Sequence, residues 1–103
     1  MTNNFVMVNG KIGFEPKIFS TKKGGKMASC SLNVYAGKDK DGKAQYINLT
    51  VKTFDTKSAE TIEMLGKGGA ILVTGRLNVE SYEKDGKKTY NTVIVANNVA
   101  TAQ

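Results

Sequence analysis

Residues 44–67 read AQYINLTVKTFDTKSAETIEMLGK and combine a strand pattern with a helix pattern in one continuous stretch. Over residues 44–54, apolar residues alternate with polar or aromatic ones, as on a strand with one buried face. From Asp55, which can cap a helix, the apolar residues recur at helical spacing. Gly66 can end this helix, because glycine readily adopts the left-handed conformation found there. We therefore expect a strand that leads directly into one short helix.

Four further strand patterns surround this segment, at residues 4–17, 27–35, 70–83 and 87–99. The resulting order is β-β-β-α-β-β, with the helix between the third and fourth strands. This is the order of the OB-fold, a five-stranded all-β barrel whose open face binds oligonucleotides or oligosaccharides. A flat sheet that carries one helix is the alternative architecture.

The length and composition exclude several classes of protein. The chain has 103 residues, which is the size of one domain, and we expect that domain to span residues 1–103. It has no His and a single Cys, so a Cys/His zinc site or a nucleophile paired with His is excluded. No apolar run is long enough to span a membrane, and the N-terminus lacks the pattern of a secretion signal. We expect a cytoplasmic, non-enzymatic domain without a metal or cofactor.

The charge is strongly basic and unevenly distributed. Fifteen Lys and Arg residues oppose nine Asp and Glu residues, which gives a formal net charge of +6. Residues 55–67 hold three acids and two lysines, so the basic excess lies on the strands and loops and not on the helix. A basic domain with aromatic residues favours a polyanion partner, most often a nucleic acid. Alternatively, the lysines serve only to keep a small domain in solution.

Four aromatic residues fall on the outward parity of the predicted strands: Tyr35, Tyr46, Phe54 and Tyr82. Proteins hold single-stranded nucleic acid by stacking bases on aromatic rings beside a basic surface that follows the phosphates. We therefore expect these four rings to stack on bases, although each could instead pack beneath a loop or in a subunit interface. The residues expected to neutralise phosphates are Lys22, Lys23, Lys26, Lys52, Arg76, Lys84, Lys87 and Lys88.

The strand residues that alternate with these outward residues should face inward and form the core. The strand residues expected to face inward are Ile47, Leu49, Val51, Ile71, Val73, Leu77 and Val79. Cys30 alternates with other apolar residues, so we expect it to be a small core residue. Phe5, Phe14 and Tyr90 are expected in the core or in an interface. A two-residue turn at 85–86 would place Tyr90 on the inward parity.

Several stretches, in order along the chain, resemble the bacterial single-stranded DNA-binding protein family, including its phage and plasmid members. The family opens with V-x-L-x-G-x-L-x-x-D-P-E, which residues 6–17 follow, and continues with A-x-F-S-L-A, which residues 28–33 match. Its F-G-K-x-A-E and Y-L-x-K-G segments correspond to 54–60 and 64–68. Its later strand, aromatic-bearing hairpin and Y-x-T-x-V-x-A-x-x-V ending correspond to 71–77, Tyr82 with 84–87, and 90–99.

The resemblance covers about residues 4–99 and implies an OB-fold that binds single-stranded DNA. It places Phe54 and Tyr82 on stacking positions of the family, and Tyr35 close to another. The position of the family's Trp on the third strand holds Asn48 here, and Tyr46 can substitute from two residues away on the same face. The resemblance also implies a homo-oligomer, a dimer or a tetramer.

The acidic C-terminal tip through which the family recruits replication and repair proteins has no counterpart before Gln103, so we expect a tail-less member. Together these observations predict a domain that binds and protects single-stranded DNA without strong sequence preference, in DNA replication, recombination or repair. We expect it in a bacterial cell, encoded by the host, a phage or a plasmid. One alternative is an RNA-binding or primosome-accessory OB domain. Another is an OB domain that binds only protein, with its outward aromatics buried against the partner.

Overall fold

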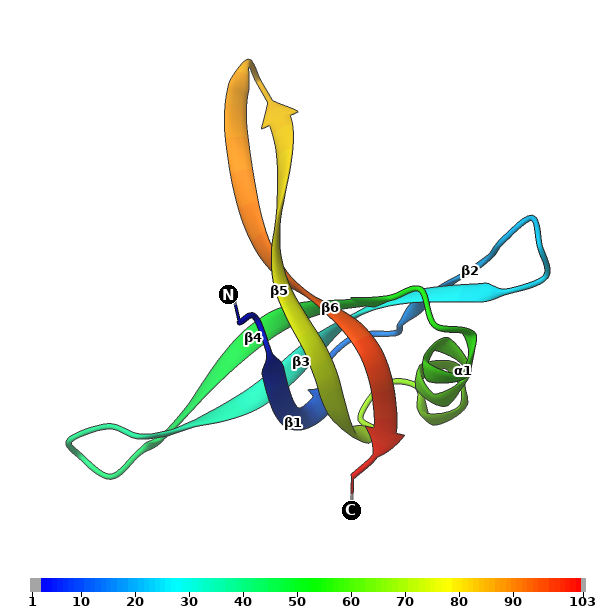
Figure 1. Ribbon diagram of the computed structural model, residues 1–103. Helices are drawn as coiled ribbons and strands as arrows, with labels where there is room; N and C mark the ends of the chain where they lie inside the picture. The colour runs from blue at the N-terminus through cyan, green and yellow to red at the C-terminus, as the bar shows by residue number, and fades with distance from the viewer. Residues whose placement is uncertain (1–2, 103) are drawn as a thin grey trace.

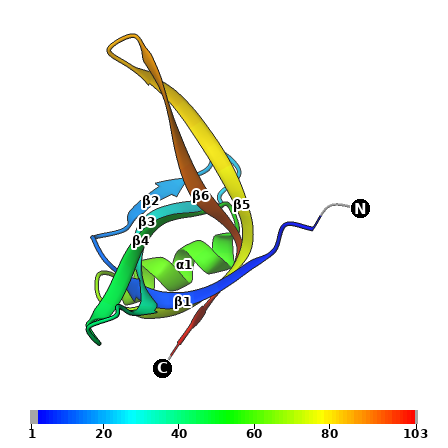
Figure 2. The ribbon, with the colours of Figure 1, turned by 90° about the vertical axis from the view of Figure 1, so that its left-hand side faces the viewer.

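The computed structural model describes residues 3–102 and contains one helix and a single six-stranded sheet that curls into a barrel (Figures 1 and 2). The elements are β1 (Val6–Ile12), β2 (Lys17–Ser20), β3 (Lys26–Lys38), β4 (Ala44–Thr53), α1 (Thr56–Leu65), β5 (Ala70–Lys84) and β6 (Lys87–Thr101). The strand order is β1-β5-β6-β4-β3-β2, and β1 also pairs with β3, which closes the barrel. Strands β4 and β6 are parallel, whereas the other pairs are antiparallel.

The predicted OB architecture is confirmed, with one change in the numbering of its strands. The segment expected as a single strand over 4–17 forms β1 and then a separate short strand, β2, after a break at 13–16. Gly13 at this break lies so close to the Ser31 hydroxyl that a Cβ there would be 2.7 Å from it, and Pro16 has no N–H to donate to a ladder. The helix therefore lies between β4 and β5, after the third of the five strands that form the barrel.

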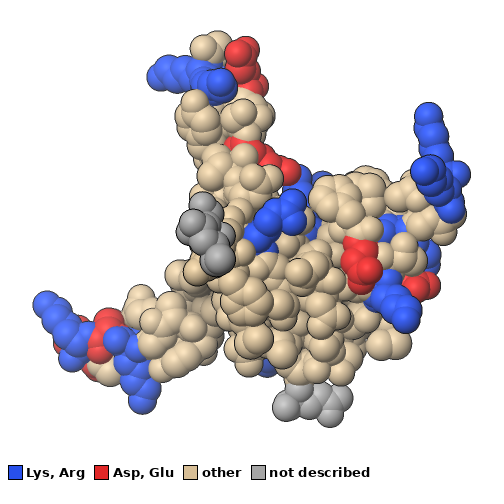
Figure 3. Space-filling view, in the orientation of Figure 1, with Lys and Arg blue, Asp and Glu red and all other residues tan. Residues whose placement is uncertain are grey.

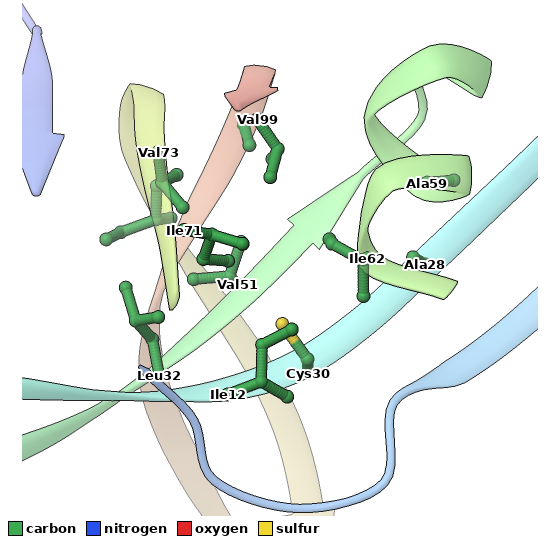
Figure 4. Packing of buried hydrophobic residues seen from close by; sticks show 12 residues of the cluster. Ile12, Ala28, Cys30, Leu32, Val51, Ala59, Ile62, Ile71, Val73 and Val99 are labelled. Atoms are coloured by element: carbon green, nitrogen blue, oxygen red, sulfur yellow. The ribbon is translucent and has the colours of Figure 1, made fainter. Parts of the chain in front are cut away.

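The barrel encloses one hydrophobic core, shown in Figure 4. Leu32, Val51 and Ile71 are fully buried in it, and Cys30 points its sulfur into the same cluster. Burial raises the pKa of the Cys30 thiol to about 11, so this side chain is a neutral packing residue. Helix α1 covers one end of the barrel and contributes Ile62 to the cluster.

Polar contacts attach α1 to the strands on either side of it. The Asp55 carboxylate caps the helix by accepting from the backbone N–H of Ser58 at 3.0 Å and from its hydroxyl at 2.7 Å. These hydrogen bonds lower the pKa of Asp55. The same Ser58 hydroxyl accepts from the backbone N–H of Val99 on β6 at 3.0 Å, and the Thr53 hydroxyl donates to the Ala96 carbonyl at 2.9 Å. The helix start, the end of β4 and β6 are thus joined.

A β-bulge between β5 and β6 lies where β5 ends its pairing with β1. Thr74 pairs with Asn98 and Gly75 with Ala96, so Asn97 is the extra residue on β6. A Cβ at Gly75 would collide with the Val95 carbonyl oxygen, so only glycine permits this close approach of the two strands. Strand β6 stays paired with β4 as far as Val93, and from there the two strands continue as a hairpin that extends well away from the barrel (Figure 1).

Three apolar residues that the sequence assigned to the core are exposed, Leu77 and Val79 on β5 and Ile47 on β4, so that part of the prediction is wrong. Leu77 is 47% exposed, and Val79 and Ile47 are exposed to a similar degree. Leu77 does face the same side of β5 as Val73, as predicted, but β5 has left the barrel at this point and no element covers the side chain. The inward positions before the bulge, Ile71 and Val73, are buried as expected.

For the other aromatic residues, which were expected in the core or in an interface, the core alternative is wrong and the interface alternative stays a prediction. Phe5, Phe14 and Tyr90 are all exposed in the described chain, so none of them is a core residue. The turn at 85–86 has two residues, both with positive φ, and Ser81 pairs with Tyr90 as the two-residue turn predicts.

Replacing Leu32 with Ala should lower the free energy of unfolding by about 2–5 kcal/mol, because this side chain is fully buried. Phe54→Ala is the control: Phe54 is 61% exposed, so its loss should change stability little. Urea unfolding of both variants at one protein concentration measures the difference. Equal losses would show that Phe54 is packed in the core.

Candidate nucleic-acid interface

The side of β3 and β4 that faces away from the core forms a regular ladder of polar and aromatic pairs. Four directly opposed pairs follow one another along it: Ser29 with Lys52, Ser31 with Thr50, Asn33 with Asn48, and Tyr35 with Tyr46. With a rise of about 3.3 Å per residue, the pairs extend over roughly 20 Å. All carry polar or aromatic side chains, whereas the alternate positions of both strands face the core.

The same surface continues over β6 and onto β5. Thr50 pairs with Val93 and Lys52 with Val95 on β6, and these pair in turn with Asn78 and Arg76 on β5. We call the whole surface the outer face. Its residues are Ser29, Ser31, Asn33, Tyr35, Tyr46, Asn48, Thr50, Lys52, Arg76, Asn78, Glu80, Tyr82, Val93 and Val95.

An ion pair crosses the middle of the outer face. The Lys52 ammonium contacts both carboxylate oxygens of Glu80, at 2.7 and 2.8 Å. Because Lys52 lies on β4 and Glu80 on β5, the pair spans the intervening strand β6. Val93 and Val95 of β6 are buried although they do not belong to the barrel core. The outer face is therefore least accessible to solvent along this strand.

Two hollows with aromatic walls lie along the outer face. The first, of about 540 Å³, is lined by Asn33, Tyr35 and Tyr46, together with residues of β1. The rings of Tyr35 and Tyr46 meet edge to face, with centroids 5.8 Å apart. The second, of about 320 Å³, is lined by Phe54 and Phe19 beside the Lys52–Glu80 ion pair. An exposed aromatic ring beside a cationic group can stack on a base while the cation contacts a phosphate.

Phe19 was not identified from the sequence. It lies on β2, pairs with Met27 and lines the same hollow as Phe54. Strand β2 has only four residues, which is too few to distinguish it from a loop by its pattern. The sequence therefore did not indicate on which face of the sheet Phe19 lies. The one available signal was the adjacent β-branched and aromatic residues Ile18 and Phe19, which are types favoured in strands.

The structure brings most of the predicted site residues to one surface. Tyr35, Tyr46, Lys52, Arg76 and Tyr82 lie on the outer face, and Phe54 borders it. All four aromatic rings are exposed, as their parity predicted. The outer face therefore combines stacking surfaces with basic groups.

The remaining lysines lie on projecting turns or on other faces. Lys22 and Lys23 lie in the turn before β3, and Lys84 and Lys87 flank the tip of the β5–β6 hairpin, where Figure 3 shows basic side chains gathered. Lys88 lies on the opposite face of the hairpin, with its ammonium 6.0 Å from the centre of the Tyr90 ring.

Lys26 is directed to the helix and not to the outer face. It shares the parity of the buried Ala28, and its ammonium contacts the Glu63 carboxylate of α1 at 2.7 Å. The hydrogen bond to Glu63 raises the pKa of Lys26. Parity with Ala28 could have separated Lys26 from Lys52, but the strand was expected to begin only at residue 27, so Lys26 was grouped with the loop lysines.

Residues 3–102 match the Single-strand binding protein family. The chain belongs to this family. It is 32% identical over 102 residues to the single-stranded DNA-binding protein of Fusobacterium nucleatum, covering 93% of this chain and 64% of that protein. It is 31% identical over 98 residues to the single-stranded DNA-binding protein of Clostridium tetani, covering 93% of this chain and 68% of that protein. The chain thus spans less than two-thirds of the length of the first of these relatives.

The fold is also similar to that of a solved family structure, the Plasmodium falciparum SSB in complex with ssDNA. The TM-score is 0.85 with 22% sequence identity, and the alignment covers 100% of this chain and 97% of that one. This similarity confirms the OB-type barrel. The family is non-enzymatic, so the expectation that the chain is not an enzyme is confirmed by its membership.

No helix within residues 3–102 is long and apolar enough to cross a membrane. Within the same residues, no group of three or more His, Cys, Asp or Glu side chains is placed to hold a metal ion.

Replacing Glu80 with Gln should strengthen binding of oligo-dT and make it more dependent on salt. The change removes the carboxylate that offsets the charge of the Lys52 ammonium, so that Lys52 can neutralise a phosphate fully. Each added phosphate contact on a single strand steepens the slope of log affinity against log salt by about 0.7. Fluorescence anisotropy with labelled oligo-dT at several salt concentrations measures this slope.

Glu63→Gln is the matched control, because it breaks a Lys–Glu pair of the same length on the helix side of the molecule. It should leave the salt slope unchanged. If both variants steepen the slope equally, the effect comes from net charge alone, and Lys52 has no special place in the interface.

Proposed function

We propose that this domain binds and protects single-stranded DNA without strong sequence preference, in DNA replication, recombination or repair. The observation that carries the proposal is the outer face, where exposed aromatic rings lie at both ends of a polar surface that also holds Lys52 and Arg76. Membership of the family supports it. No bond is made or broken: the protein holds the strand extended and covers its bases.

The proposed contacts divide into two kinds. Bases stack on Tyr35 and Tyr46 at one end of the outer face and on Phe54 and Tyr82 toward the other, and Phe19 adds a ring to the hollow at Phe54. Phosphates are neutralised by Lys52, Arg76, Lys22, Lys23, Lys84 and Lys87. Lys26 and Lys88 lie on other faces, so we propose that they act only through the long-range positive field. Stacking of this kind tolerates any sequence, because every base has a π-face.

We further propose that the chain forms a homo-oligomer, a dimer or a tetramer. Leu77, Val79 and Tyr90 share the face of the β5–β6 hairpin that is opposite to Tyr82, and all three are exposed in the single chain. Exposed apolar residues that gather on one surface mark an interaction site. A second copy of the chain would cover them while leaving the outer face open to DNA.

We also propose a cytoplasmic location in a bacterial cell, with the chain encoded by the host, a phage or a plasmid. The support is the bacterial source of the two relatives and the single, buried, unpaired Cys30. Domains of this size that fold without a disulfide suit a reducing compartment.

Phe54→Ala and Tyr82→Ala should each weaken binding of oligo-dT about tenfold or more. Base–aromatic stacking is worth roughly 1–3 kcal/mol per base, and both rings are exposed on or beside the outer face. Tyr90→Ala is the control, because this ring is equally exposed but lies on the opposite face of the hairpin. Anisotropy titrations at one salt concentration give the three affinities, and equal losses in all three would contradict the assignment of the outer face.

The same titration with oligo-U of equal length tests the RNA-binding alternative. Preference for oligo-dT supports the proposed function, whereas clear preference for oligo-U would favour an RNA-binding or primosome-accessory domain. If neither oligomer binds, the aromatic surface serves a protein partner.

Replacing Val79 with Asp should lower the oligomeric state, because a charge placed on the exposed apolar face of the hairpin could not be buried against a second copy. Sedimentation velocity of the wild-type chain and the variant measures the mass of each. A wild-type chain that is monomeric at all concentrations tested would overturn the proposed oligomer.

A further inference from the structure

Two asparagine side chains form a pair on the outer face, next to the Tyr35–Tyr46 end. Asn33 on β3 lies directly opposite Asn48 on β4, and the amide nitrogen of Asn33, Nδ2, donates to Oδ1 of Asn48 at 3.2 Å. The next pair along the same two strands is Tyr35 with Tyr46. The two carboxamides are therefore held next to two exposed aromatic rings.

The pair leaves most of its hydrogen-bonding capacity unused. Each carboxamide has two N–H donors and an oxygen that can accept twice. Within residues 3–102 their mutual bond is the one hydrogen bond that these two side chains make, so Oδ1 of Asn33 and Nδ2 of Asn48 are free. One acceptor, on Asn33, and one donor, on Asn48, thus remain available to a ligand.

The hollow that Asn33 lines is large enough for a planar ligand, and Asn48, which is not part of its lining, is hydrogen-bonded to Asn33. Asn33, Tyr35 and Tyr46 line the hollow of about 540 Å³, and Asn9 and Lys11 of β1 close its other side. Pockets for small organic groups have volumes of about 300–1,000 Å³. The lining offers ring faces, carboxamides and one cation, which are the groups that contact a base and its phosphate.

We propose that this hollow holds one nucleobase by its pairing edge, with Asn33 and Asn48 bonded to that edge and the tyrosine rings beside the base. The proposal rests on the proposed binding of single-stranded DNA and adds to it a site that hydrogen-bonds. Carboxamide side chains form paired hydrogen bonds with base edges, and proteins recognise unstacked bases through these edges.

The consequence is that the hollow selects single-stranded DNA over duplex DNA and does not select a base sequence. The pairing edge of each of the four bases offers a donor next to an acceptor, so carboxamides that can rotate serve all of them. A base within a duplex has this edge occupied by its partner. The hollow therefore favours single strands over duplexes without favouring one base.

The test uses oligo-dT and an oligomer of equal length built from N3-methylthymidine, in which the methyl group removes the N3–H donor and blocks the pairing edge. The ring face and the phosphates are retained, so stacking and charge contacts remain. Wild-type protein should bind the methylated oligomer about threefold to tenfold more weakly, since a hydrogen bond contributes about 0.5–1.5 kcal/mol net.

The Asn33→Ala/Asn48→Ala double variant should bind both oligomers equally, and Asn48→Ala alone should lose part of the discrimination. Asn98→Ala is the matched control: this exposed amide pairs with Thr74, outside the outer face, and the variant should discriminate as the wild-type protein does. Thermal unfolding confirms that each variant is folded.

Two results would overturn the proposal: equal binding of the two oligomers by the wild-type protein, or undiminished discrimination by the folded double variant. Failure of the proposed function would look different, because the wild-type protein would then not bind unmodified oligo-dT at all.

Discussion

The structure depends on the register between β3 and β4. Eight consecutive residue pairs, from Ala28 with Thr53 to Tyr35 with Tyr46, follow one another without a shift. This ladder places the buried Leu32 in the core and the polar Asn33 on the outside. Because side chains alternate between faces, a slip by one residue would exchange the two sets. One constraint therefore creates both the barrel core and the candidate DNA-binding surface.

The outer face, where the strand of DNA would pass, is mostly polar, whereas the opposite face of the β5–β6 hairpin is apolar. The centre of the outer face holds the Lys52–Glu80 ion pair, which keeps an ammonium in place above β6 while offsetting its charge. Beyond the bulge at Gly75, the hairpin has two different sides: Tyr82 on the outer face and Val79 on the other. A single projecting hairpin can thus serve DNA on one side and a second copy of the chain on the other.

The sequence could predict those features that depend only on residues close together in the chain. Alternation and helical spacing are local, so the order of strands and helix along the chain and the outward direction of Phe54 were predicted. Leu77 was expected in the core because alternation shows which way a side chain points but not where the barrel ends. Phe19 was missed because its strand is four residues long. The pairing of Lys26 with Glu63 joins residues far apart in the chain, and no local pattern indicates it.

The central claim is that single-stranded DNA lies along the outer face, and intermolecular nuclear Overhauser effects in a complex with oligo-dT test it most directly. The account predicts contacts from thymine and deoxyribose protons to the rings of Tyr35, Tyr46 and Phe54. The side chains of Met7 and Asn98, on the β1–β5–β6 side of the barrel, should show none. Contacts concentrated on Met7 and Asn98, with none to the three rings, would contradict it.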